Sequence, residues 1–178
     1  MKVIFLDIDG VLSTPKYIMY QCKRHKLGRL YAYEASFHFE SCVMRNLKEI
    51  VDRTNAYIVI SSTWRLFGNN RQINFDLWKK GEYVIEDNHW IGMMNNLNEW
   101  GIGDRVIGIT PHFCEVDSKR GDEIRDWLSW HLEVENFAII DDDSDMREFT
   151  ETKLAKCQNH FGLTKKVKEK AIKILGEN

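Results

Sequence analysis

Residues 3–12 read Val-Ile-Phe-Leu-Asp-Ile-Asp-Gly-Val-Leu, a short apolar run that ends in Asp7 and Asp9 and is followed by Gly10. The run is typical of a buried β-strand, and the glycine predicts a tight loop after it. Asp7 would then lie at the carboxyl edge of a sheet, where open α/β sheets bind ligands. Carboxylates clustered there repel each other unless a cation, most simply a divalent metal, lies between them. A buried strand followed by an acidic turn is the alternative.

Composition places the chain among ordinary globular domains. Its 178 residues can bury a core of normal size, and 43% of them are hydrophobic and 29% charged. The formal net charge of −2 gives no overall attraction to nucleic acid or membranes. No apolar run approaches the ~20 residues of a membrane helix, and the first residues are too few for a signal peptide. The four scattered cysteines favour reduced thiols, so we expect a cytoplasmic protein.

The rest of the chain alternates strand-like and helix-like segments. Apolar runs predict strands at 3–6, 57–60, 105–109, 137–140 and 154–158. Helical periodicity predicts helices around 43–51 and 167–175, and a third with an apolar stripe of Ile124, Trp127, Leu128 and Leu132. This alternation predicts an α/β fold with a central parallel sheet covered on both faces, in a single domain spanning 1–178. The stretches 13–38 and 66–104 are longer than simple connections, which is typical of functional insertions.

Three hydroxyls follow the second predicted strand, in the run Ser61-Ser-Thr-Trp-Arg65. Hydroxyls and the backbone N–H groups after them are good donors to a phosphoryl oxygen. A helix beginning near Thr63 would add its positive end to such an anion site. Helix capping by serine or threonine is the alternative use of these residues.

Lys119 and Arg120 open a predicted amphipathic helix. Cations in a first helical turn oppose the helix dipole, so their presence indicates a phosphate or a carboxylate cluster nearby. A solvated basic turn is the alternative.

The fourth predicted strand ends in acid as abruptly as the first. It is followed by Asp141, Asp142, Asp143 and Asp145, four carboxylates within five positions. Such a concentration costs stability unless a cation or solvent relieves it. Together with Asp7, the run favours a divalent metal site built from two strand ends over an exposed acidic turn.

In this order, the four segments resemble the motifs of the haloacid dehalogenase (HAD) superfamily of phosphohydrolases. Asp7-Ile-Asp-Gly10 is similar to its first motif, Ser61 to its second, Arg120-Gly-x-x-Ile124 to its third and Asp141-Asp142 to its fourth. Within it, the chain resembles the HAD domain of Swiss Army Knife RNA repair proteins, on Ser61–Arg65, Ile107–Pro111, Arg120–Ile124, Asp141–Met146 and Gly162–Thr164. The resemblance implies a three-layer, Rossmann-like HAD core with a central parallel sheet and small or minimal cap insertions.

The same resemblance implies Mg²⁺-dependent hydrolysis of a phosphomonoester through an aspartyl-phosphate. Asp7 would be the nucleophile, and Asp9 would be the general acid and then the general base. Mg²⁺ would be bound by the Asp7 carboxylate, the Asp9 carbonyl and Asp142. Asp141 would be a direct ligand or lie just behind the ligands.

The phosphoryl group would be bound by Ser61, and its charge neutralised by Arg120. Two assignments stay open, because Ser62 could replace Ser61 and because the third motif usually carries lysine, which Lys119 could supply. We favour Ser61, which ends the apolar run, and Arg120, which fits the motif register. Further candidates for substrate binding are Gly10, Ser62 and Arg65.

The first insertion is rich in cations and tyrosines. Between Asp9 and Glu34 it has no acidic residue, and it carries Lys16, Tyr17, Tyr20, Lys23, Arg24, Lys26, Arg29, Tyr31 and Tyr33. This combination suits a nucleic-acid strand, with Lys23 and Arg24 as candidate contacts, whereas a flap with inward tyrosines and solvated lysines is the alternative.

The predicted substrates are therefore phosphorylated RNA or DNA ends, or nucleotides. A small-metabolite phosphatase and a non-hydrolytic phosphate-binding or signalling module are the competing functions. No feature of the sequence predicts a protein partner or a membrane.

Overall fold

The computed structural model describes residues 1–24, 38–67, 71–83 and 87–177. Its helices and strands are β1 (Lys2–Leu6), α1 (Pro15–Arg24), α3 (Ser41–Thr54), β2 (Tyr57–Ile60), β3 (Leu66–Phe67), β4 (Arg71–Gln72), α4 (Phe75–Lys79), α5 (Asn88–Glu99), β5 (Val106–Ile109), α6 (Arg120–Ser129), β6 (Asn136–Asp141), β7 (Leu154–Lys156) and α7 (Lys165–Leu175). Short 3-10 turns lie at Thr63–Arg65, Gly103–Arg105 and Arg147–Phe149.

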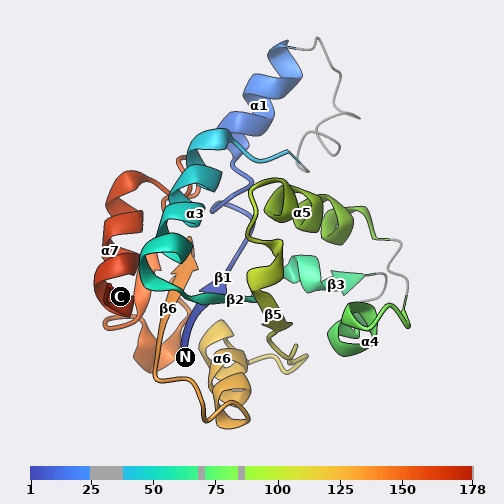
Figure 1. Cartoon of the computed structure of the whole chain (residues 1–178), viewed down its shortest axis with the longest axis vertical. Coiled ribbons are helices and arrows are strands. Elements are labelled where there is room, and N and C mark those ends of the chain that lie inside the picture. Colours follow the sequence, from blue (N-terminus) through green and yellow to red (C-terminus); the bar gives the residue numbers. More distant parts are fainter. Residues whose placement is uncertain (25–37, 68–70, 84–86, 178) are drawn as a thin grey trace.

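Five parallel strands form the central sheet in the order β5-β2-β1-β6-β7 (Figure 1). Leu6 at the end of β1 lies opposite Ile60 of β2 and Ile140 of β6, so these three strands end at one level. The chain winds outward from β1 through β2 and β5, and then returns to the other side of β1 with β6 and β7. The crevice at such a reversal is where open α/β sheets bind ligands.

Side-chain alternation along β1 divides the core into two parts. Ile4 and Leu6 belong to the larger cluster, with residues of α3, α5 and α7, whereas Val3 and Phe5 belong to the smaller one, with residues of α6. Helices therefore cover both faces of the sheet, because each face of a parallel sheet must bury its apolar side chains. The predicted three-layer α/β architecture is confirmed.

Two local predictions are wrong. Thr63 begins a three-residue 3-10 turn and not a helix, so no helix dipole points at the site from there. Helix α6 ends at Ser129, and Leu132, which the apolar periodicity placed in its stripe, is 88% exposed. In both places the chain must change direction at once, at the first into β3 and at the second towards β6, and this overrides the local pattern.

The two insertions differ in how they join the body. Helix α1 has no buried residue and projects above the carboxyl ends of the strands (Figure 1). The stretch 66–104 contains β3, β4, α4 and α5, and α5 contributes Trp90, Met93 and Leu97 to the larger core cluster. This stretch is therefore part of the body, which agrees with small cap insertions.

Lys26, Arg29, Tyr31 and Tyr33 of the first insertion lie outside the described residues. Among the helices that the structure describes, none is long and apolar enough to cross a membrane.

Candidate active site

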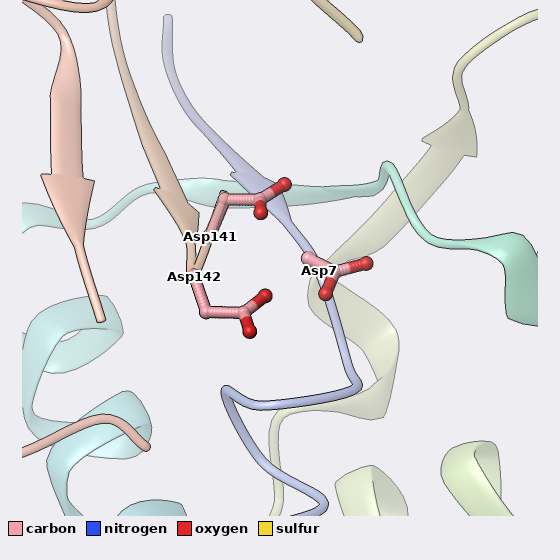
Figure 2. Close-up of side chains that lie close together, drawn as sticks. All are labelled: Asp7, Asp141 and Asp142. Atoms are coloured by element: carbon pink, nitrogen blue, oxygen red, sulfur yellow. The ribbon is translucent and has the colours of Figure 1, made fainter. Parts of the chain in front are cut away.

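Three carboxylates meet at the carboxyl ends of β1 and β6. Asp7 follows β1, Asp141 ends β6 and Asp142 follows it, and one oxygen of each lies within 4.8 Å of the others. Figure 2 shows the three side chains close together, with the Asp142 carboxylate extending towards Asp7. Asp7 is 7% exposed and Asp141 3% exposed, so little water separates their charges. The fold thus brings together three of the predicted metal ligands from two distant parts of the chain.

The electrostatics of this cluster favour a bound cation. Burial raises the pKa of Asp7, and the nearby Asp141 carboxylate raises it further. Burial also raises the pKa of Asp141, whereas Arg120 lowers the pKa of both acids. Buried carboxylates that repel each other form an all-oxygen donor set, which is the kind that hard cations such as Mg²⁺ prefer. The residues present therefore fit the metal that the sequence predicted.

Fixed donors and a close backbone hold the acids in place. The Asp143 N–H donates to the Asp141 carboxylate at 2.8 Å, and Asn159 Nδ2 donates to Asp142 Oδ2 at 2.8 Å. Gly10 has a φ of +70°, and a Cβ there would lie 2.3 Å from Asp142 Oδ2. Glycine is therefore required for the loop after β1 to approach the acids.

Mg²⁺ is expected to stabilise the protein against heat more at about pH 8 than at about pH 5. Because the pKa values of Asp7 and Asp141 are raised above the ordinary 3.8, the metal-free folded protein holds protons that the unfolded chain has lost. Its stability therefore falls as the pH rises past the unfolded pKa. Mg²⁺ displaces those protons and binds more tightly at higher pH. Calorimetric scans with and without Mg²⁺ at both pH values measure the difference.

Asp142→Ala should lose most of this Mg²⁺-dependent stabilisation, because it removes one of three carboxylates. Asp143→Ala is the matched control, since Asp143 is adjacent and exposed and lies outside the cluster. If Mg²⁺ stabilises Asp142→Ala as much as the wild type, Asp142 is not a ligand.

Asp9 lies apart from the three-carboxylate cluster, and Trp64 holds it there. Trp64 Nε1 donates to Asp9 Oδ2 at 2.9 Å, and the Trp64 side chain is buried. The His89 ring packs edge-on against Trp64 with the ring centroids 4.8 Å apart. Desolvation raises the pKa of Asp9, while the indole hydrogen bond and His89 lower it. A carboxyl group held in this way is suited to proton transfer.

Of the two candidate cations, the structure brings Arg120 to the acids. Its Nη2 lies 4.0 Å from Asp7 Oδ1, and its side chain is only 18% exposed. Lys119 is exposed, and its backbone N–H donates to the Asp122 carboxylate at 3.0 Å. The geometry therefore supports the choice of Arg120 made from the motif register.

The two serines after β2 have different surroundings. Ser61 is buried, and its hydroxyl accepts a hydrogen bond from Thr110 Oγ1 at 3.5 Å. A hydrogen bond from the Ser62 hydroxyl lowers the pKa of Asp7, and Ser62 Oγ also accepts the Trp64 N–H at 3.4 Å. The contact with Asp7 favours Ser62 as the phosphate donor, whereas the apolar run alone favoured Ser61.

Arg65, a candidate for substrate binding, is buried in the body. Its guanidinium donates to the carbonyls of Ser62 at 2.6 Å, Thr110 at 2.9 Å and Pro111 at 3.0 Å, and to Glu123 Oε2 at 2.8 Å. Burial lowers the pKa of Arg65 to about 10. Because most of its N–H groups have protein acceptors, the structure favours a role in holding the ends of β2 and β5 to α6.

Sequence reasoning missed Trp64, Asn159 and Glu123. Trp64 and Asn159 reach acids 55 and 17 residues away in the chain, and no local pattern signals such contacts. Glu123 stands three residues after Arg120 in a helix, and the two lie 3.6 Å apart. Helical spacing could therefore have revealed that pair.

Lys23 and Arg24, the remaining sequence candidates, are both exposed at the end of α1. Lys23 lines a groove with His160, a residue from the far end of the chain.

A parallel sheet with acids at its reversal point, next to a helix that presents arginine, agrees with the HAD-like hydrolase fold that the motifs predicted. The sequence matches the family model described as the HAD domain in Swiss Army Knife RNA repair proteins over residues 3–167. The chain belongs to this family.

A solved structure of a haloacid dehalogenase-like family hydrolase from Streptococcus pneumoniae is also similar. It is 13% identical with a TM-score of 0.41, over 85% of this chain and 80% of that one. No curated protein matches the sequence.

Proposed function

We propose that this chain is a Mg²⁺-dependent phosphomonoester hydrolase that acts through an aspartyl-phosphate. The observation that supports this most is the setting of Asp7, a buried carboxylate beside Asp141 and Asp142 with Arg120 at 4.0 Å. Family membership supports the hydrolase class.

In the first step, an Asp7 carboxylate oxygen attacks phosphorus and the bond to the substrate oxygen breaks. The leaving alkoxide takes the proton of Asp9, whose raised pKa favours the protonated form. Arg120 and the Ser62 hydroxyl bind the phosphoryl oxygens, where negative charge develops.

In the second step, water attacks the phosphorus of the aspartyl-phosphate, and the Asp9 carboxylate accepts its proton. The bond between phosphorus and Asp7 breaks, which releases inorganic phosphate and restores the Asp7 carboxylate. Asp7, Asp141 and Asp142, with the Asp9 carbonyl, would hold Mg²⁺, which when bound supplies positive charge to the phosphoryl oxygens.

The substrates we propose are phosphorylated ends of RNA or DNA, because the matched family occurs in RNA repair proteins. Phosphate release from 3′- and 5′-phosphorylated RNA and DNA, mononucleotides and an aryl phosphate, with and without Mg²⁺, tests this. We expect Mg²⁺-dependent release that is fastest from the oligonucleotides. Release from small compounds alone would indicate a nucleotide or metabolite phosphatase, and release from none would indicate a non-hydrolytic phosphate-binding module.

Trp64→Phe is expected to slow hydrolysis of an alkyl phosphate by roughly ten-fold, and that of an aryl phosphate much less. The variant removes the N–H that holds the Asp9 carboxylate. A poor alkoxide leaving group needs the proton from Asp9, whereas an aryl oxide leaves readily without it. The measurement is kcat for the two substrates.

Trp90→Phe is the control, because Trp90 is an equally buried tryptophan that packs against Phe75 and Trp78. It should affect both substrates alike. A uniform decrease in the Trp64 variant as well would mean that Trp64 only supports the fold.

A further inference from the structure

A groove of about 290 Å³ lies between α1 and the loop that follows β7. Its lining residues are Lys16, Met19, Tyr20 and Lys23 of α1, and His160 of the loop. The α1 residues are spaced i, i+3, i+4 and i+7, so they share one face of the helix. This face of α1 is therefore turned towards the loop.

The chemistry of the groove is apolar and aromatic in the middle and cationic at its ends. Met19 is 55% exposed and Tyr20 51%, which leaves an apolar surface open to a ligand. Lys16 and Lys23 are separated by about 10 Å along the helix axis. Neither α1 nor residues 158–164 contain an acidic side chain that could neutralise these lysines.

The loop adds a second aromatic group. The Phe161 side chain is 51% exposed. Lys16 Nζ lies over its ring, 5.6 Å from the ring centroid, and the His160 ring packs edge-on against it with the centroids 5.1 Å apart. Exposed rings beside cations are the features by which proteins bind single-stranded nucleic acid, because bases stack on the rings and phosphates contact the lysines.

The same loop connects this groove to the acid cluster. Asn159, next to His160, donates to Asp142, and Leu163 N–H donates to the Val11 carbonyl at 3.0 Å, just before α1. Gly162 packs so closely that a Cβ there would lie 2.4 Å from the Val11 oxygen. The loop that forms one side of the groove is thus attached to the acid cluster, where a phosphoryl group would be bound.

We propose that this groove binds the nucleotides next to the terminus of a single-stranded nucleic acid, with bases on Phe161 and Tyr20 and phosphates on Lys16 and Lys23. The inference rests on the proposed function for the chemistry at the terminus. Binding to the groove itself needs no catalysis. An acidic peptide could use the lysines, but it would not need the rings.

Fluorescence anisotropy with a labelled single-stranded RNA that lacks a terminal phosphate measures binding without turnover. The double variant Lys16→Gln and Lys23→Gln should raise the Kd for this RNA roughly ten-fold. The slope of log K against log salt concentration should become shallower by about 0.7 for each lysine removed. Phe161→Leu should raise Kd by a similar factor through lost stacking, whereas Phe161→Tyr keeps the ring and should bind normally. Lys170→Gln with Lys173→Gln, on exposed positions of α7, is the charge-matched control.

Hydrolysis of a small aryl phosphate should be unchanged in all of these variants, because the groove residues do not touch the reacting group. Unchanged RNA binding in the lysine double variant or in Phe161→Leu would contradict the proposal that the groove binds nucleic acid. It would not affect the proposal that the protein is a phosphatase. Equal loss of RNA binding and aryl phosphate turnover would also contradict nucleic-acid binding by the groove, since α1 would then only shape the active site. If these variants bind RNA more weakly but the wild-type protein hydrolyses no phosphomonoester, nucleic-acid binding by the groove is supported and the proposed function is contradicted.

Discussion

Asp7→Asn is expected to lower phosphatase turnover by at least about 10³-fold while leaving the protein folded. The amide has the shape of the carboxylate but cannot attack phosphorus. The pKa of Asp7 is raised by burial and by Asp141, so the charged form of Asp7 is unfavourable in the metal-free protein. A neutral side chain should therefore leave the thermal unfolding temperature without Mg²⁺ equal to that of the wild type or higher.

Turnover of an aryl phosphate and the unfolding temperature should be measured on the same preparation. Asp143→Asn provides the matched control, because it makes the same change at an exposed acid near the site and should keep full activity. An Asp7→Asn protein that turns over at the wild-type rate would show that Asp7 is not the nucleophile.

Glu123→Ala is expected to destabilise the protein by roughly 3–5 kcal/mol, the usual result of leaving a buried charge without its partner. Glu123 is the carboxylate partner of Arg65, which is 1% exposed, and it also accepts the Phe113 N–H at 3.2 Å. Without it, the Arg65 guanidinium stays buried, and no other carboxylate in the part of the chain that the structure describes lies at hydrogen-bonding distance from it. In a protein of this size the unfolding temperature should fall by about 10 °C.

Glu148→Ala tests whether burial is the cause. Glu148 pairs with Arg125 on the surface, where the two side chains are 52% and 48% exposed. Glu148→Ala should lower the free energy of unfolding by less than about 1 kcal/mol, because solvent screens the ion pair. Chemical denaturation of both variants gives the comparison, and equal costs would contradict a special role for the buried pair.

The ends of β1 and β6 show most clearly what could be predicted from the sequence. The apolar runs before Asp7 and Asp141 predicted buried parallel strands, and the motif order predicted the HAD family; both are confirmed. These predictions succeed because the burial of each strand, and each motif, depends on residues that are consecutive in the chain. The structure then places those acids within 4.8 Å of one another, as parallel pairing of β1 and β6 requires.

The choice between neighbouring residues needed the structure. Ser61 and Ser62 are equivalent by type, but consecutive side chains leave a strand in different directions, and Ser62 meets Asp7. Arg65 resembles a substrate ligand in the sequence, yet it is buried against carbonyls from the loop after β5. The helical spacing of apolar residues predicted Leu132 as part of the helix, but α6 ends at Ser129.

By itself, the sequence determined the class of fold, the strand ends that carry the acids, and the family. Each of these can be recognised from short runs of consecutive residues, namely the apolar strands and the motifs that follow them. Only the tertiary structure decided that Trp64 holds Asp9, that Glu123 balances Arg65, and that α1 faces His160 across a groove. These contacts join residues 55, 58 and more than a hundred positions apart. They arise when separate elements pack against one sheet, and no periodicity in the chain records which side chains then meet.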